Sequence, residues 1–369
     1  MTSPSTGAVS GSSVTVNTVL GPIPVSELGV TLTHEHLLND LSEALHGGTR
    51  PFSSQIAEIP VSPASAWMLR EDPYASRDNC SMSLADLPIV AEELGLFAAV
   101  GGRTLVDNTT GKGRRPAALV ELSRRTGLNL VMGGGWCLSH GQEHTLTSAD
   151  VDRMASELIA EIRDGVEVPG QEPVKVGAIG EIGVGLDFTA AERVTLEAAA
   201  IAQHETGIPM LIHLPGWQRR AHEALDVVEK LGVDLGSVVL CHMDPSGKDT
   251  AYQRDVAARG SWLEFDMIGM PFNFPGEGQS PSVEDTVAAV TGLLADGHGD
   301  RLLLSHDTFL KGMWTRNGGN GYAYVPTAFL PRLVAEGVDQ SIVDSLLTDN
   351  PAALFTRAAH HSASTRTLT

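Results

Sequence analysis

The stretch Val30-Thr-Leu-Thr-His34-Glu35-His36-Leu-Leu38 places two histidines two residues apart at the end of a short apolar run. In a β-strand, side chains at positions i and i+2 point to the same face, so strand 30–33 is predicted to present both imidazoles together. Glu35 is expected to point to the opposite face, as a supporting or packing residue. A His-x-His pair is a weak signal alone, because a hydrogen-bonded structural pair looks the same. Its meaning depends on what the ends of other strands carry.

Seven further short apolar runs follow this strand and alternate with helical stretches. Apolar strands without polar alternation are typical of a parallel sheet buried on both faces, and eight such units predict a TIM (β/α)8 barrel. A doubly wound open sheet is the alternative, but the glycine-rich nucleotide loop expected after its first strand is missing. The further predicted strands are Thr104–Asp107, Leu128–Met132, Val176–Ile179, Met210–Ile212, Val238–Leu240, Trp262–Asp266 and Leu302–Leu304. The predicted helices are Ser83–Val100, Pro116–Thr126, Ser148–Asp164, Ala190–Thr206, Gln218–Lys230, Tyr252–Arg259, Val283–Ala295, Ala328–Glu336 and Gln340–Leu347.

The expected domain organisation is one barrel over residues 14–358, between disordered tails at 1–13 and 359–369. A short β lead-in, with Val14–Val16 and Ile23–Val25 flanking Leu20-Gly21-Pro22, precedes the first strand. Residues 41–82 contain four prolines and are predicted to be a long excursion with some helix around Ala64–Arg70. A second insertion, rich in proline and glycine, covers Gly269–Ser282.

Composition excludes several classes of function. The chain has 369 residues and a net charge of −20, which disfavours binding to nucleic acid or to anionic membranes. Its three cysteines, Cys80, Cys137 and Cys241, are too few and too widely spaced for a disulfide framework. The first residues lack the basic start and apolar segment of a signal peptide, and no apolar run is long enough to span a bilayer. A cytoplasmic location is expected.

Ionisable side chains collect where the predicted strands end. They belong to strands one, four, five, six and eight: His34, His36, Glu181, His213, His242 and Asp307. In a barrel these ends share one mouth, where active sites lie. Each residue alone has a structural explanation as a cap, ion pair or hydrogen-bonded side chain, but six at equivalent positions favour a metal site.

Four histidines and two carboxylates exceed one tetrahedral zinc site and suit two ions, which lie about 3.5–4 Å apart in binuclear hydrolases. Zinc is the expected metal, with Mn²⁺, Co²⁺ or Fe²⁺ as alternatives. A water shared by two such ions loses its proton near neutral pH and becomes a nucleophile.

Several motifs resemble the phosphotriesterase-like family of the amidohydrolase superfamily. They are Val16-Asn-Thr-Val-Leu-Gly-Pro-Ile23, the segment Glu27–Leu37, Gly177-Ala-Ile-Gly-Glu-Ile-Gly183, Ile212-His-Leu214, Leu240-Cys-His242 and Ser305-His-Asp307. The resemblance runs from about Val14 to about Phe355. Within the family, Leu263-Glu264-Phe-Asp266 and Gly318-Gly-Asn-Gly-Tyr322 are similar to the branch of phosphotriesterase-related proteins.

The resemblance implies that His34, His36 and Asp307 bind the more buried metal, that His213 and His242 bind the more exposed one, and that residue 181 bridges both. The best-known members have a carboxylated lysine as the bridge, whereas this chain has Glu181. A glutamate reaches the same space without needing CO₂, so the bridging role is expected to survive.

The expected function is hydrolysis at a carbonyl centre, in a small N-acyl amide or a lactone. Phosphoester or phosphotriester hydrolysis is the alternative, and a non-catalytic metal-binding module is a more remote one. Asp307 is predicted to take the proton of the nucleophile and to pass it on, through His242 or His306. His306 itself is interpreted as mainly structural.

The substrate is expected to be a small molecule held by the loops at the barrel mouth. Arg220 could hold a substrate anion in bidentate fashion, although it could equally be a solvated arginine at a helix start. Trp136, Trp217 and Tyr322 are the other predicted substrate contacts. The resemblance also makes a homodimer a reasonable expectation.

Overall fold

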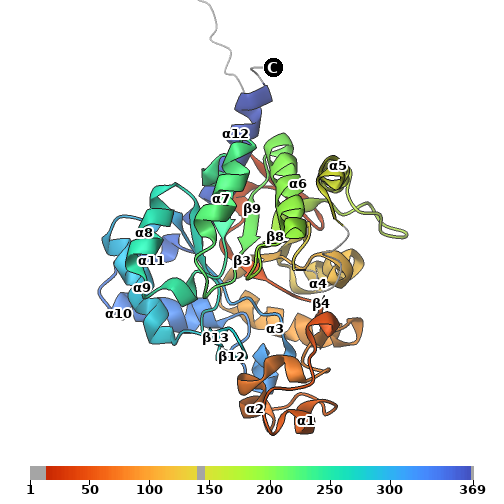
Figure 1. Ribbon diagram of the computed structural model, residues 1–369, viewed down its shortest axis with the longest axis vertical. Coiled ribbons are helices and arrows are strands. Elements are labelled where there is room, and N and C mark those ends of the chain that lie inside the picture. Colours follow the sequence, from red (N-terminus) through yellow and green to blue (C-terminus); the bar gives the residue numbers. More distant parts are fainter. Residues whose placement is uncertain (1–13, 139–145, 367–369) are drawn as a thin grey trace, which may run out of the picture.

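The computed structural model describes residues 14–138 and 146–366, and eight parallel strands form its central sheet (Figure 1). The strands are β3 (Val30–Glu35), β6 (Gly102–Asp107), β7 (Asn129–Gly134), β8 (Val176–Gly183), β9 (Met210–His213), β10 (Val238–Leu240), β11 (Trp262–Phe265) and β14 (Leu302–Leu304). They pair in sequence order, each with the next, and every ladder is parallel. The predicted TIM barrel is confirmed, since a doubly wound sheet would not keep sequence order across the sheet.

The strands are buried because both faces of the sheet are covered. All eight residues of β8 are buried, and so are the three leucines of β14. A strand that is buried on both faces has no solvent-facing side, so its sequence does not show a polar residue at every second position.

Helices surround the barrel. They are α3 (Leu87–Ala99), α4 (Pro116–Thr126), α5 (Val151–Arg163), α6 (Ala190–Thr206), α7 (Ala221–Lys230), α8 (Thr250–Ala258), α9 (Val283–Ala295), α10 (Leu330–Ala335) and α11 (Gln340–Ser345). Helix α6 shows why the boundaries were predictable. Thr189 and Glu192 form a capping box at its start, and Gly207 ends it with a φ of 72°.

The last helix was not predicted. Helix α12 (Asp349–Arg366) follows α11 and extends into the range 359–369, which the sequence analysis treats as a tail. Its residues Leu354 and Phe355 pack at the end of the barrel where the strands begin, beside Val16 and Trp262. Residues 1–13, the other expected tail, lie outside the described residues.

The first and last strands are joined largely by side chains. Glu35, at the end of β3, accepts hydrogen bonds from the backbone N–H groups of His306 and Thr308, 3.0 and 2.9 Å long. In the opposite direction, the His34 N–H donates to Ser305 Oγ (2.9 Å). One backbone–backbone bond, from the Asp307 N–H to the His34 carbonyl (3.2 Å), adds to these. Glu35 therefore does support the structure, as expected, by fastening β3 to the segment after β14.

The lead-in covers the end of the barrel opposite the strand-end residues. It is a hairpin of β1 (Thr15–Thr18) and β2 (Gly21–Pro24), as the sequence predicts. Asn17 Nδ2 donates to the Val176 carbonyl (3.2 Å), at the beginning of β8. Gly177 permits this contact, because a Cβ there would lie 2.3 Å from the Asn17 carbonyl oxygen.

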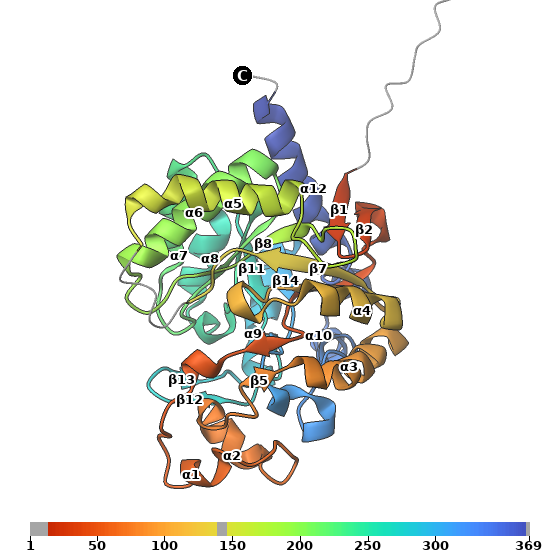
Figure 2. The same ribbon diagram turned by 90° about the vertical axis from the view of Figure 1, so that its right-hand side faces the viewer.

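The two insertions lie together over the other end (Figure 2). The excursion after β3 contains β4 (Asn39–Asp40), α1 (Ser53–Ile56), α2 (Ala66–Glu71) and β5 (Ser81–Met82), and the later insertion contains β12 (Asn273–Phe274) and β13 (Gly278–Gln279). Both contribute to one apolar cluster that includes Cys80, Met270, Phe272, Phe274 and Phe309. In the part of the chain that the structure describes, we find no helix with the length and apolar character of a membrane span.

Candidate metal centre

All six strand-end residues lie in one cluster at the carboxyl ends of the strands. Glu181 is at its centre. Glu181 Oε2 lies 3.0 Å from His213 Nδ1, 3.4 Å from His242 Nε2 and 3.5 Å from His34 Nε2. Glu181 Oε1 lies 3.4 Å from His36 Nε2. One carboxylate thus reaches all four histidines.

The cluster divides into two groups that share Glu181. His34, His36 and Asp307 form the first, with Asp307 Oδ1 3.6 Å from His34 Nε2 and 3.2 Å from His36 Nε2. His213 and His242 form the second, with 2.8 Å between His213 Nδ1 and His242 Nε2. This grouping follows the sequence resemblance; His34 also lies within 4.8 Å of Glu181 and His242, so the two groups adjoin each other.

Two of the six residues have unusual backbone conformations. His242 and Asp307 have φ angles of 58° and 51°, in the left-handed region that side-chain-bearing residues seldom occupy. Such conformations persist when surrounding contacts impose them, and they are common at functional sites. Here the His242 N–H donates to Asp266, and the Asp307 N–H donates to the His34 carbonyl.

A second set of polar residues holds the histidines from behind. Asp266 Oδ1 accepts a hydrogen bond from His242 Nδ1 (2.8 Å), and Asp266 Oδ2 lies 3.1 Å from His34 Nδ1. Thr109 Oγ1 lies 2.9 Å from His36 Nδ1. These partners leave the Nε2 atoms of the three histidines facing the cluster, which fixes the ring orientation that a metal ligand needs.

The role of Asp266 was missed in the sequence analysis, although its position contains the signal. It was placed at the end of predicted strand Trp262–Asp266 but was left out of the strand-end residues. Glu264, two residues earlier, is fully buried; it accepts a hydrogen bond from Thr33 Oγ1, and its Oε2 lies 3.6 Å from His34 Nδ1.

The electrostatics favour a cation. Burial lowers the pKa of His36, but the nearby carboxylates of Asp307 and Glu181 outweigh it and raise that pKa to about 9. Conversely, burial raises the pKa of Glu181, yet the charges of His213 and His34 hold it well below its usual value. Without a cation, a proton on His36 therefore balances the charge of the buried carboxylates.

The donor atoms fit divalent metal ions. His34 Nε2 and Asp307 Oδ1 are buried and have no hydrogen-bond partner among the described residues, although both face the cluster. Buried polar atoms are rarely left unpaired, so such atoms indicate a missing partner. Imidazole and carboxylate groups suit zinc and neighbouring transition metals, and the two groups sharing Glu181 could hold one ion each.

The family model for the phosphotriesterase family matches residues 14–355. The chain belongs to the phosphotriesterase family. It is therefore a hydrolase, and enzymes of this family are binuclear metal hydrolases, in agreement with the cluster above.

Curated relatives cover almost the whole chain of this phosphotriesterase-family member. An N-acetyltaurine hydrolase from Salmo salar is 32% identical over 346 residues, which are 92% of this chain and 97% of the relative. A phosphotriesterase-related protein from Nematostella vectensis is 30% identical, with the same coverage of both chains.

Solved structures show the same fold. A resiniferatoxin-binding protein from Rhodobacter sphaeroides superposes with a TM-score of 0.87 at 45% identity, covering 92% of this chain and 94% of that one. A phosphotriesterase homology protein from Escherichia coli, complexed with phosphate in its active site, gives 0.70 at 27% identity, covering 89% and 99%. A lactonase from Listeria monocytogenes gives 0.71 at 25% identity, covering 93% and 99%.

His306 is structural in this family member, in agreement with its interpretation from sequence. Its Nδ1 donates to Glu35 Oε1 (2.6 Å), and its Nε2 accepts a hydrogen bond from the Val325 N–H (2.8 Å). Both ring nitrogens are occupied by these bonds. A proton relay through His306 would require one of these bonds to be exchanged, and this role stays a prediction.

Tyr322 corrects another expectation. Its side chain is 0% exposed, and its hydroxyl donates to the His36 carbonyl (2.8 Å). It therefore supports the backbone of His36 from behind and does not line the mouth. The spacing of residues 318–322 in the sequence could not reveal this contact.

Arg220 is engaged within the protein. Its Nη2 donates to the Leu186 carbonyl (2.7 Å), and its Nη1 forms an ion pair with Glu223 (2.8 Å). Its predicted capture of a substrate anion would require these bonds to be exchanged. Trp136 is half-buried against the cluster around Val151 and Val194, and its substrate contact stays a prediction.

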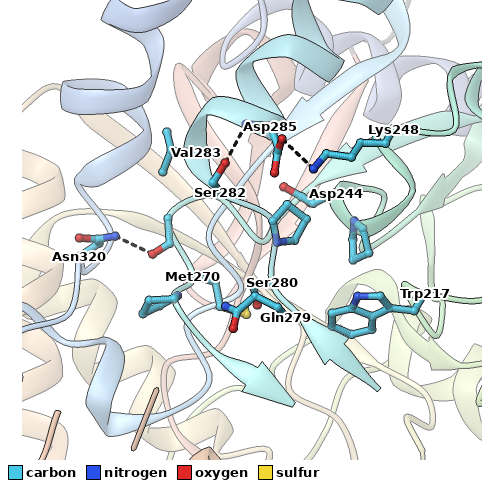
Figure 3. A pocket seen from close by; sticks show the side chains of 15 residues that line it. Trp217, Asp244, Lys248, Met270, Gln279, Ser280, Ser282, Val283, Asp285 and Asn320 are labelled. Carbon is cyan, nitrogen blue, oxygen red and sulfur yellow. Dashed lines mark hydrogen bonds and ion pairs between the residues drawn. The ribbon is translucent and has the colours of Figure 1, made fainter. Parts of the chain in front are cut away.

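Trp217 lines a cavity of about 610 Å³ on the mouth side of the barrel (Figure 3). The walls come from the loops after β9, β10, β11 and β14. Lys248 and Asp285 form an ion pair at 3.1 Å on one side, and Asn320 donates to the Gly269 carbonyl on another. Asp244, two residues after His242, also lines it. The cavity has the size of a small-ligand site, and it lies among loops that follow the strands carrying the candidate ligands.

Proposed function

We propose that this hydrolase binds two divalent metal ions, zinc in the first place, and cleaves the amide bond of a small N-acyl amide. His34, His36 and Asp307 would hold one ion, His213 and His242 the other, and Glu181 both. The position of Glu181 carries the proposal, because its two oxygens lie within 3.5 Å of a nitrogen of every histidine in the cluster.

The amide substrate is supported by the relatives. Proteins named N-acetyltaurine hydrolase are 30–33% identical to this chain over nearly its full length. A lactone is the second candidate, because one solved neighbour is a lactonase. A phosphoester is the third, since another neighbour holds phosphate in its active site. A purely metal-binding module does not fit membership of a hydrolase family.

The bound ions would supply Lewis-acid activation of a water and of the scissile carbonyl. Asp307 is the residue placed to move the proton. Its Oδ1 has no hydrogen-bond partner among the described residues and faces the same space as His36 Nε2. It can accept a proton from the attacking water and return it to the leaving amine, as general acid–base catalysis requires.

The surrounding residues keep Asp307 in position and limit the proton path. His242 Nδ1 lies 4.0 Å from Asp307 Oδ2 but donates to Asp266 instead. With His306 also occupied, an onward relay through either imidazole would require a bond to be exchanged. We therefore propose direct transfer from Asp307 to the leaving group.

The test is a comparison of substrate classes with the zinc-loaded enzyme. N-acyl amino acids and N-acyl aminosulfonates, lactones and phosphoesters are assayed in parallel, with the metal content determined in each preparation. We expect about two ions per chain and the highest kcat/KM on an N-acyl amide. Preferred turnover of phosphoesters, or activity that survives complete metal removal, would overturn the proposal.

A further inference from the structure

Cys137 lies beside the part of the metal cluster that contains Glu181 and His213. Cys80 and Cys241 are buried, whereas Cys137 is partly exposed. It follows β7, the strand that pairs with β8, and β8 carries Glu181. Its Sγ, one Glu181 oxygen and one His213 nitrogen all lie within 4.8 Å of one another. The thiol therefore joins the second group of candidate ligands, which none of the sequence motifs indicated.

Close backbone packing brings Cys137 to this place. The Gly183 N–H donates to the Trp136 carbonyl (3.0 Å), and the Cys137 N–H donates to Thr110 Oγ1 (3.1 Å). A Cβ on Gly183 would lie 2.5 Å from the Leu138 nitrogen and 2.9 Å from the Cys137 carbonyl carbon. Only glycine permits the segment after β7 to lie this close to β8, two residues beyond Glu181.

Independent features of the cluster indicate a cation. His34 Nε2 and Asp307 Oδ1 are buried without a partner among the described residues, and Glu181 connects them to the Cys137 side. On that side the protein offers Glu181, His213 and His242, which are three ligands. Catalytic zinc sites have three protein ligands and one open position, whereas a fourth protein ligand closes the tetrahedron.

We propose that Cys137 Sγ is the fourth protein ligand of the ion held by Glu181, His213 and His242 in the resting enzyme. This inference rests on the metal pair of the proposed function. When the bond between sulfur and metal forms, the thiol proton is released to solvent and no oxidation or reduction occurs. Substrate then has to displace the thiolate, so the resting centre is closed and the working centre is open.

The sulfur ligand has a consequence for metal choice. Thiolate is a soft ligand that favours zinc over manganese, which prefers oxygen donors. We therefore expect replacement of Cys137 by serine to reduce the preference for Zn²⁺ over Mn²⁺. Competition between the two ions, measured by metal analysis at equilibrium, reports this change without any assay of activity.

X-ray absorption spectroscopy on the zinc-loaded protein tests the proposal directly. Zinc–sulfur bonds are about 2.3 Å long, whereas bonds to nitrogen or oxygen are about 2.0–2.2 Å. We expect a sulfur shell in the wild type and in the matched control Cys80→Ser, and its loss in Cys137→Ser. A wild-type spectrum with nitrogen and oxygen alone would overturn the proposal. So would a sulfur shell that survives in Cys137→Ser and disappears in Cys241→Ser.

Alkylation gives a second measurement that needs only the wild type. Iodoacetamide should modify Cys137 in the metal-free protein, and zinc should protect it, as mapped by mass spectrometry. Equal modification with and without bound zinc would refute coordination by sulfur. Failure of the protein to bind two ions at all would instead refute the proposed function, so the two failures are distinguishable.

Discussion

Replacement of Asp266 by asparagine tests whether the outer carboxylate sets metal affinity. Asp266 contacts one histidine from each group, His242 Nδ1 at 2.8 Å and His34 Nδ1 at 3.1 Å. Asparagine keeps the shape but loses the charge, and its NH₂ group would face an imidazole N–H. Loss of such a partner costs about 10–100-fold in metal affinity or activity.

The magnitude follows from the two contacts. With about tenfold lost at each ion, the product of the two affinities falls about 100-fold, which corresponds to about 2.8 kcal/mol. Because Asp266 donates no ligand atom to the central cluster, both ions should still bind at high zinc concentration. The variant should therefore have weakened affinity and unchanged stoichiometry.

The assay is titration of metal-free protein with zinc against a chromophoric chelator. Asp255→Asn, which changes an exposed carboxylate on α8, is the matched control and should titrate like the wild type. Circular dichroism of the metal-free proteins checks that the folds are equal. If Asp266→Asn bound both ions as tightly as Asp255→Asn, the assigned role of Asp266 would be wrong.

Three further predictions concern other parts of the site. Asp307→Asn should retain bound metal but lose about 100-fold or more in kcat, because a positioned acid–base group contributes at least that much; wild-type turnover would exclude Asp307 as the proton carrier. Since the pKa of His36 is raised to about 9, His36 is protonated at pH 7 in the metal-free protein and must release its proton to bind zinc. Zinc affinity should therefore rise about tenfold per pH unit for each proton released, up to about pH 9. Calorimetry in buffers of different ionisation enthalpy counts the protons that are released on zinc binding. No proton release at pH 7 would contradict this prediction. Tyr322→Phe should lower the free energy of unfolding by about 1 kcal/mol, from loss of the bond to the His36 carbonyl, and leave KM unchanged; a large rise in KM with normal stability would restore Tyr322 as a substrate contact.

The strand-end residues were predictable because the fold converts sequence position into spatial position. In a parallel barrel, a residue such as Glu181 or His213 at the end of its strand must face the common mouth. Asp266 obeys the same rule and was found only in the structure, because it had been treated as part of its strand. The residues at the ligand-bearing end of the barrel could thus be predicted from the sequence, and Asp266 could have been included among them.

The loops were less predictable because their path depends on packing between segments far apart in the chain. Nothing near Tyr322 shows that its hydroxyl reaches the His36 carbonyl. Similarly, the bond from Arg220 to the Leu186 carbonyl joins two different loops. The approach of Cys137 to Glu181 depends on the missing side chain of Gly183, which is a contact between neighbouring strands and not a local motif.

The fastening of β3 to the segment after β14 has a consequence for the order of assembly. Glu35 and His306 are 271 residues apart in the chain, and contacts of such long range form at a large cost in chain entropy. His34 and His36 lie on the β3 side of this contact and Asp307 on the β14 side. The site that these three residues form therefore does not exist until the barrel closes. If closure follows the rate-limiting step, bound zinc stabilises contacts that the transition state lacks, and it should slow unfolding while leaving the folding rate nearly unchanged. The metal ions would then stabilise the closed barrel after it has formed, and they would not initiate its folding.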